Sequence, residues 1–147
     1  MSKTMRMEQA TKRTVAVLAV ALMPIVPFSM AKAEQSPTAG QKPTPAIEKL
    51  RGRWLRDTGG YIIEIRSVEA GGKLEAAYFN PRSIHVGRAQ AVEQGGVVKV
   101  SVELRDVNYP GSTYTLIHDP KNDRLVGRYF QAVTGETFDV TFVRLKT

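Results

Sequence analysis

Apolar and polar residues alternate along most of the chain after residue 51, and this period of two is typical of β-strands, whose successive side chains point to opposite faces. The clearest run covers 98–105, where the apolar positions are Val98, Val100, Val102 and Leu104. Short stretches rich in Gly, Pro and Asn separate the runs, including a turn predicted at Asn108–Gly111. Eight strands are predicted, the first opening at Gly52 and the others covering 61–66, 73–80, 83–93, 98–105, 112–118, 124–132 and 138–145.

No segment has the apolar spacing of a long amphipathic helix, and one helical turn is predicted at 47–50. Eight antiparallel strands joined in order by short turns are expected to close as an up-and-down barrel. Closure removes the strand edges that would otherwise pair with another chain. The alternative is a two-sheet sandwich, whose crossovers need longer connections than these turns. The sequence therefore predicts an all-β fold, an eight-stranded antiparallel up-and-down barrel over residues 51–147.

The first 33 residues follow the pattern of a secretory signal peptide. A basic region ends at Lys12-Arg13, an apolar stretch runs over 15–28, and Ala31-Lys32-Ala33 has the small residues that a signal peptidase accepts. The apolar stretch is short and interrupted by prolines, which argues against a membrane anchor. We expect cleavage after Ala33, a periplasmic or secreted bacterial protein, and no membrane span in the mature chain.

Residues 34–50 are predicted to be a flexible tail and a lead-in to the barrel. From Glu34 to Pro45 the chain has no large apolar residue, so it cannot bury enough surface to offset the entropy of ordering. Three domains follow from these patterns: a signal peptide over 1–33, the tail over 34–50 and the barrel over 51–147.

Composition narrows the function classes. The net charge of the 147 residues is +7, but residues 1–33 hold five of the basic residues and one acidic residue, which leaves 16 basic against 13 acidic. That balance predicts an ordinary soluble surface and no nucleic-acid partner. The chain has no cysteine, which excludes disulfides, thiolate metal sites and a cysteine nucleophile.

Catalytic and metal-binding patterns are missing from the sequence. The two histidines, His85 and His118, do not provide the three or four converging ligands of a metal site, and we interpret them as surface or rim residues. The glycine pairs lie in hairpins and not before helices, so they do not form a phosphate-binding loop. No nucleophile elbow is present either. We therefore expect a protein that is not an enzyme and has no cofactor or metal.

Tyrosines share strand faces with amide side chains, Tyr78 with Asn80 and Tyr129 with Gln131. A buried tyrosine hydroxyl needs a hydrogen-bond partner. Such groups at the mouth of a barrel could hold a small ligand, or they could satisfy one another inside a filled barrel. The candidate ligand-binding residues are Tyr78, Asn80, Tyr114, Tyr129 and Gln131. Two phenylalanines, Phe138 and Phe142, are interpreted as core residues.

Gly52 and Trp54 lie on the first predicted strand, and Arg144 lies on the last, on the same face as Phe138, Val140 and Phe142. A barrel makes these two strands neighbours. The guanidinium of Arg144 is then expected to contact the indole face of Trp54 and backbone carbonyls at the floor of the barrel. Gly52, Trp54 and Arg144 are the predicted structural residues.

The Gly-x-Trp of the first strand, the meandering strands and the arginine of the last strand resemble the calycin superfamily, which includes lipocalins, fatty-acid-binding proteins, avidins and bacterial metalloprotease inhibitors. The resemblance implies a barrel whose closed end is formed by Gly52, Trp54 and Arg144. The long first loop of lipocalins, the pocket tryptophans of avidins and the disulfide of the inhibitors are not found in this sequence. The resemblance therefore implies a shape and not the ligand of any one family.

Three functions remain, two of them non-catalytic; the third, an enzyme, ranks last and would be favoured by convergent titratable groups in one cleft. The first is an exported, lipocalin-like barrel that binds a small, partly apolar ligand. The alternative is a periplasmic module that binds or inhibits a protein partner through its loops or its N-terminal tail, with Tyr109 as an exposed aromatic anchor. A hollow barrel lined by tyrosines would favour the first, and a filled barrel with an exposed Tyr109 would favour the second.

The signal-peptide pattern gives a first testable prediction. The exported protein should have the intact mass of a chain that begins at Glu34, because cleavage is expected after Ala33. Mass spectrometry of the periplasmic fraction measures this directly. A full-length chain in the membrane fraction would contradict it.

Overall fold

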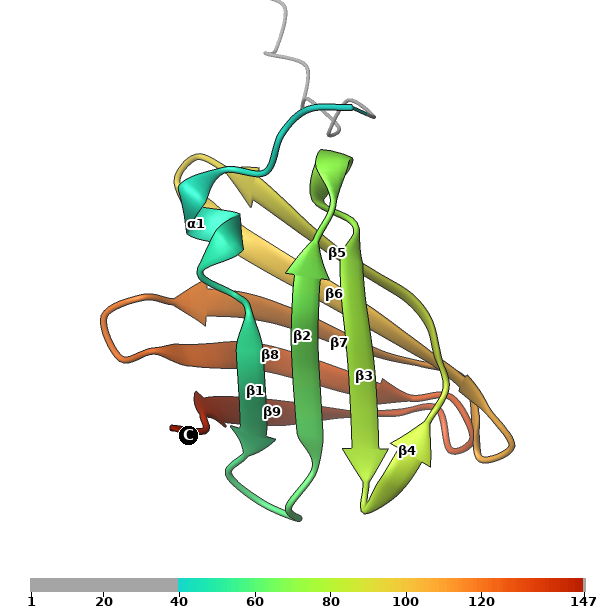
Figure 1. Ribbon diagram of the computed structural model, residues 1–147. Coiled ribbons are helices and arrows are strands. Elements are labelled where there is room, and N and C mark those ends of the chain that lie inside the picture. Colours follow the sequence, from blue (N-terminus) through green and yellow to red (C-terminus); the bar gives the residue numbers. More distant parts are fainter. Residues whose placement is uncertain (1–39, 147) are drawn as a thin grey trace, which may run out of the picture. The chain divides into compact units, whose positions relative to one another are not determined.

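The computed structural model describes residues 40–146, so the predicted signal peptide and the first part of the predicted tail lie outside the described residues. No helix in this part of the chain is long and apolar enough to cross a membrane. The described chain is mostly β-structure, with two short helical turns, as Figure 1 shows. Its elements are α1 (Pro45–Glu48), β1 (Gly52–Arg56), β2 (Ile62–Val68), η1 (Ala70–Gly72), β3 (Leu74–Asn80), β4 (Arg82–Ile84), β5 (Val86–Gln94), β6 (Val97–Asp106), β7 (Tyr109–Asp119), β8 (Arg124–Gln131) and β9 (Glu136–Arg144).

All strand pairs are antiparallel, and the strands form one sheet in the order β4-β3-β2-β1-β9-β8-β7-β6-β5. The sheet curls on itself, so that β1, β2 and β3 lie across β5 to β9 (Figure 1). The first and last strands pair, with Trp54 opposite Arg144. The predicted all-β up-and-down barrel is therefore confirmed in outline, as a nearly closed barrel.

The predicted number of eight strands is wrong, because the run expected over 83–93 is divided at His85 into β4 and β5. At His85 the chain turns away from β3 and bonds to the end of β6. The His85 carbonyl accepts from Arg105 N at 2.9 Å, and the His85 N–H donates to the Asp106 carboxylate at 2.9 Å. Gly87 lies against Arg105, where a Cβ would be 2.5 Å from Cγ. β4 thus pairs with β3 and β5 with β6, giving nine strands.

The two ends of the sheet meet at a seam between β3 and β5. A single bridge joins Lys73 to Gln90 there. Gly72 allows the close approach, because a Cβ on it would lie 2.1 Å from the Ala91 carbonyl oxygen, and its φ of 79° is in the left-handed region. Because a single bridge stands in place of a full ladder of hydrogen bonds between β3 and β5, the barrel is nearly closed.

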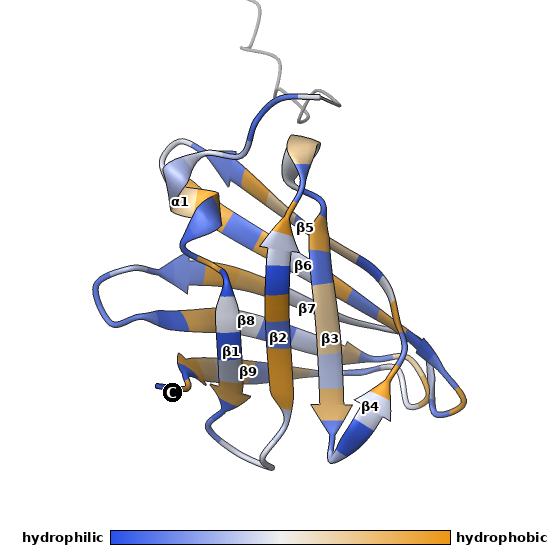
Figure 2. Ribbon diagram, viewed as in Figure 1, coloured by the Kyte–Doolittle hydropathy of each residue, from blue (hydrophilic) through white to orange (hydrophobic). Residues whose placement is uncertain are grey.

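Inward positions on every strand from β1 to β3 and from β5 to β9 supply the core, and the alternation of apolar and polar residues is visible along the ribbons in Figure 2. The predicted apolar face of β6 is buried. On β5 a bulge between Val86 and Arg88 changes the face that points inward, so that Ala89 and Ala91 are buried. Phe142 is buried as predicted, but Phe138 is 40% exposed, and its assignment to the core is wrong because it lies at the open end of β9.

The turn predicted at 108–111 is displaced. β6 and β7 are joined at Val107-Asn108, and Tyr109 already pairs with Asp106. Pro110 and Gly111 belong to β7 and accommodate a register shift opposite Arg105. Tyr109 therefore starts a strand and packs against the core, and its interpretation as an exposed anchor is wrong.

The lead-in to the barrel includes one helical turn, α1. The hydroxyl of Thr44 accepts a hydrogen bond from Ile47 N, and Pro45 occupies the first turn, where its missing N–H is not needed. Ile47 and Leu50 are buried in the core. The segment just before β1 is thus packed against the barrel.

Trp54 and Arg144 form the floor of the barrel. The guanidinium carbon of Arg144 lies 4.1 Å from the centre of the Trp54 ring, the contact expected from the sequence. The indole is fully buried, and its N–H donates to the Leu50 carbonyl at 2.8 Å. Gly52 makes room for this arrangement, because a Cβ there would be 2.7 Å from Arg144 Nη1, and its φ is 132°.

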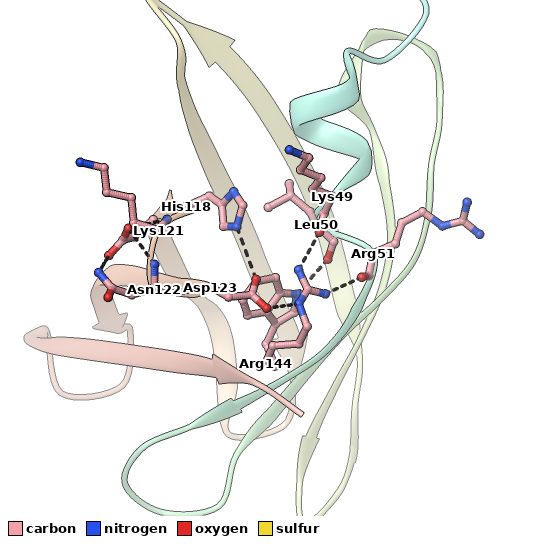
Figure 3. A network of polar contacts seen from close by, with 10 residues as sticks. Lys49, Leu50, Arg51, His118, Lys121, Asn122, Asp123 and Arg144 are labelled. Atoms are coloured by element: carbon pink, nitrogen blue, oxygen red, sulfur yellow. Dashed lines mark hydrogen bonds and ion pairs between the residues drawn. The ribbon is translucent and has the colours of Figure 1, made fainter. Parts of the chain in front are cut away.

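The remaining donors of Arg144 are used by backbone carbonyls and one carboxylate (Figure 3). Nη1 donates to the Arg51 carbonyl and Nη2 to the Lys49 carbonyl, each at 2.7 Å, while Nε donates to Asp123 Oδ2 at 2.6 Å. The side chain of Arg144 therefore connects the last strand both to the segment before β1 and to the turn between β7 and β8.

His118 also belongs to this floor, and its assignment to the surface or rim is wrong. It is 8% exposed, its ring meets the Trp54 ring edge-on at 5.8 Å, and Nε2 lies 3.8 Å from Asp123 Oδ1. Burial lowers the pKa of His118 below its usual value, and the nearby Arg144 lowers it further, against the opposite effects of Asp123 and Asp119. The folded protein therefore favours the neutral imidazole.

A double-mutant cycle tests the floor. Trp54→Ala should lower the free energy of unfolding by ~3–5 kcal/mol through lost burial and a cavity. Arg144→Ala should also destabilise, and the two effects should deviate from additivity by ~0.5–3 kcal/mol because the side chains touch. Urea unfolding followed by circular dichroism measures the stability of the single and double variants, because Trp54→Ala removes the tryptophan whose fluorescence would otherwise report unfolding. Strict additivity would contradict the contact.

The buried imidazole predicts a pH dependence of stability. Because its folded-state pKa is below the unfolded value of about 6.5, the unfolded chain binds the proton first as the pH falls. The free energy of unfolding should therefore decrease as the pH falls below about 7 and level off below the folded-state pKa. The pKa of Asp123 is lowered chiefly by its hydrogen bond to Arg144. The stability that Asp123 contributes is therefore lost only at a pH below the range in which His118 titrates.

Urea titrations read out by Trp54 fluorescence between pH 5 and pH 8, a window around the ordinary histidine pKa, isolate His118. His118→Gln should remove the decrease, and His85→Gln, at the exposed histidine, should retain it. The same slope in the His118→Gln protein would assign the effect to another group.

Candidate functional site

A pocket of about 320 Å³ opens at the end of the barrel opposite the Trp54–Arg144 floor. The strands explain its position: β1 and β3 end there, β7 and β9 begin there, and the floor lies at their other ends. All five tyrosines of the chain line it. The lining residues are Arg56, Tyr61, Tyr78, Asn80, Asn108, Tyr109, Tyr114, Tyr129, Gln131 and Phe138.

The structure brings together all five residues predicted from the sequence to bind a ligand. The Tyr78 and Tyr114 hydroxyls are 2.9 Å apart and share a hydrogen bond. Tyr114 faces Tyr129 across neighbouring strands, with ring centres 4.4 Å apart. Asn80 and Gln131 lie where β3 and β8 end, at the mouth, and the Asn80 amide donates to the Tyr109 hydroxyl.

The other five lining residues were not among the predicted ligand-binding residues. Arg56 follows Trp54 by two positions, so the alternation on β1 already placed it on the inward face. Tyr61 precedes the buried Ile63 by two positions, so the same alternation places it on the inward side. Tyr109 and Asn108 were assigned to a turn, and Phe138 was assigned to the core. Their positions in the wall follow from the registers of β7 and β9, which the sequence pattern did not provide.

Aromatic rings form most of the wall. Tyr129 stacks on Tyr114 and, at 6.5 Å, on Phe138, its register partner on β9. On the other side Tyr61 stacks on Tyr78 at 6.4 Å. Stacked pairs across strands stabilise a sheet and present flat apolar surfaces. The pocket therefore suits a molecule with a flat or compact apolar body.

Burial sets the protonation of the tyrosines. It raises the pKa of Tyr78 far above its usual value, that of Tyr114 to about 12, and that of Tyr129 above its usual value. For Tyr114 the Tyr78 hydrogen bond and the nearby Arg56 cation act in the opposite direction. At neutral pH these phenols stay protonated and can donate or accept hydrogen bonds.

Among the described residues that line the pocket, Arg56 is the one charged side chain and none is a carboxylate. Its guanidinium carbon lies 5.1 Å from the centre of the Tyr61 ring. In residues 40–146 no group of three or more His, Cys, Asp or Glu side chains is arranged to hold a metal ion. The pocket thus combines a cation, phenol hydroxyls and amides with aromatic rings, and its lining is about equally polar and apolar.

Comparison with known proteins gives no match to a family model, a curated protein or a solved structure. A function must therefore be inferred from the pocket itself.

The Tyr78–Tyr114 pair gives a prediction on stability. Tyr78→Phe or Tyr114→Phe alone should lower the free energy of unfolding by ~1–3 kcal/mol, because each leaves the other buried hydroxyl without its partner. The double variant should cost less than the sum, since no orphaned hydroxyl remains. Urea unfolding followed by Trp54 fluorescence measures all three. Additive losses would mean that the two hydroxyls do not depend on each other.

Proposed function

We propose that this protein is an exported, calycin-like β-barrel that binds a small, partly apolar ligand in its tyrosine-lined pocket and does not convert it. The observation that carries the proposal is the gathering of all five tyrosines around one open cavity at the end of the barrel opposite its floor. Tyrosines from five separate positions in the sequence meet there, beside the amides of Asn80 and Gln131.

The size and chemistry of the pocket support ligand binding. Small-molecule sites are typically concave, ~300–1,000 Å³, and mainly apolar with a few converging polar groups. The pocket has about 320 Å³, at the lower end of this range, and it combines stacked rings along its wall with hydroxyl, amide and guanidinium groups, so its lining is more polar than is typical. The Tyr78–Tyr114 hydrogen bond and the ring stacking hold the wall in place before a ligand enters, which lowers the entropy that binding must overcome.

Binding without catalysis agrees with the protonation of the wall. A general base works best with a pKa near the operating pH. The raised pKa values of Tyr78, Tyr114 and Tyr129 keep these phenols protonated at neutral pH, so they are hydrogen-bond donors and are not available as general bases. The proposal therefore assigns them to ligand recognition.

Membership of the calycin superfamily and export to the periplasm are part of the proposal. The floor formed by Gly52, Trp54 and Arg144 supports the first, since it has the contact that the resemblance implies. The signal-peptide pattern of the first 33 residues supports the second. The protein-binding alternative has less support, because Tyr109 lines the pocket and bonds to Asn80 instead of forming an exposed anchor.

Fluorescence of N-phenylnaphthylamine, a small neutral aromatic probe, tests the proposal. Its emission should rise saturably on addition of the protein. Gln131→Trp, which adds a ring inside the pocket, should weaken binding at least ~10-fold, equivalent to about 1.4 kcal/mol. Thr115→Trp, on the exposed outer face of β7, is the matched control and should bind as the unchanged protein does. No saturable increase, or equal effects of the two variants, would reject binding in this pocket.

A further inference from the structure

Arg56 is the one cation that residues 40–146 place in the pocket wall, and these residues provide no counterion for it. The ion pairs of the described residues all join other bases to their acids, and no carboxylate pairs with Arg56 in that part of the chain. Its Nε is buried and has no hydrogen-bond partner within residues 40–146. This makes Arg56 unlike Arg144, whose guanidinium donates to three partners.

The alternation along β1 explains why Arg56 points inward. Gly52, Trp54 and Arg56 lie on the same face of the strand, the first two at the floor and the third near the mouth. Its register partner on β9 is Phe142, a buried core residue. The pairing of β1 with β9 that places Trp54 opposite Arg144 therefore also places Arg56 at the pocket.

A partly buried cation without a counterion is costly unless some other group stabilises it. The Tyr61 ring provides a cation–π contact, with 5.1 Å between the guanidinium carbon and the ring centre. The Tyr114 hydroxyl is near enough to Arg56 for the cation to lower its pKa. Neither group neutralises the charge, so the wall, as the described residues form it, has a net positive charge.

The phenols, like Arg56, favour a negatively charged group in the pocket. Either hydroxyl of the Tyr78–Tyr114 pair can be the donor in their shared bond, and the other hydroxyl then has a hydrogen left to donate. Protonated phenols and a guanidinium together supply donors, while the wall supplies no negative group. Such a donor set is complementary to an oxyanion.

We propose that the ligand is a small aromatic or similarly flat apolar molecule with a single carboxylate, and that Arg56 binds this carboxylate. The proposal rests on the proposed function and specifies its ligand class. The apolar body stacks against the rings of Tyr114, Tyr129 and Phe138, and the carboxylate meets the guanidinium. A monoanion is favoured over a phosphate dianion because the wall offers a single positive charge. The planar guanidinium also matches a carboxylate with two parallel hydrogen bonds.

Isothermal titration calorimetry with two matched probes tests this. Naphthalene carboxylate and its neutral carboxamide share the apolar body and differ in charge. The unchanged protein should bind the carboxylate at least ~10-fold more tightly than the carboxamide, because a hydrogen bond to a charged group is the stronger kind. Added salt should weaken binding of the carboxylate and leave the carboxamide unaffected.

Arg56→Met should remove the preference for the carboxylate and retain binding of the carboxamide. Arg53→Met is the matched control: Arg53 lies on the same strand and is exposed on the opposite face, so the preference should persist. Arg56→Lys keeps the charge without the planar fork and should retain part of the preference. If Arg56→Met does not fold, Arg56→Gln provides the same comparison, and the two probes on the unchanged protein need no variant.

The outcomes separate the two proposals. Equal affinity for both probes in the unchanged protein would overturn the role of Arg56 and leave the binding function standing. A carboxylate preference that survives in Arg56→Met would also overturn it, by assigning the charge recognition to another group. Failure of both probes to bind would count against the proposed function itself.

Discussion

The stacking of Arg144 on Trp54 is the interaction on which the rest of this structure depends. It joins the last strand to the first, and its hydrogen bonds to the Lys49 and Arg51 carbonyls fix the chain as it enters β1. Partly burying a guanidinium is tolerable only when its donors have partners, and here each of its three nitrogens donates a hydrogen bond. Gly52 is required because any side chain would occupy the space of Nη1. The contact sets the register of β1, and that register determines which of its residues face inward.

The two ends of the barrel consequently use the same residue type in different ways. Arg144 is bonded to backbone carbonyls and to Asp123, and it closes the floor. Arg56, on the inward face of β1, lies at the pocket without an acidic partner in the described part of the chain. Structural polar groups are satisfied by the protein itself, whereas a binding group remains available for a ligand. This contrast is the physical basis for assigning structure to one end and recognition to the other.

Much of this arrangement could be predicted from the alternation of side chains. It placed Trp54 near Arg144, and it placed Tyr78 with Asn80 and Tyr129 with Gln131 on inward faces that meet in one pocket. The ninth strand could not be predicted in this way, because the division at His85 depends on hydrogen bonds to β6 that are distant in sequence. The same limit applies to His118 and Phe138. Their burial depends on how far the core extends along a strand, which periodicity does not specify.

The most direct measurement is amide NMR of the isotopically labelled protein during titration with naphthalene carboxylate. On the proposal that the ligand binds at the end opposite the floor, the largest shift changes should fall within 56–61, 78–80, 108–114 and 129–138, the segments that hold the pocket residues. Amides of 49–52, 118–123 and 144, at the floor, should change little. The largest changes at the floor or on outward faces, or no changes at all, would contradict a barrel that is sealed by Arg144 and binds its ligand among the tyrosines.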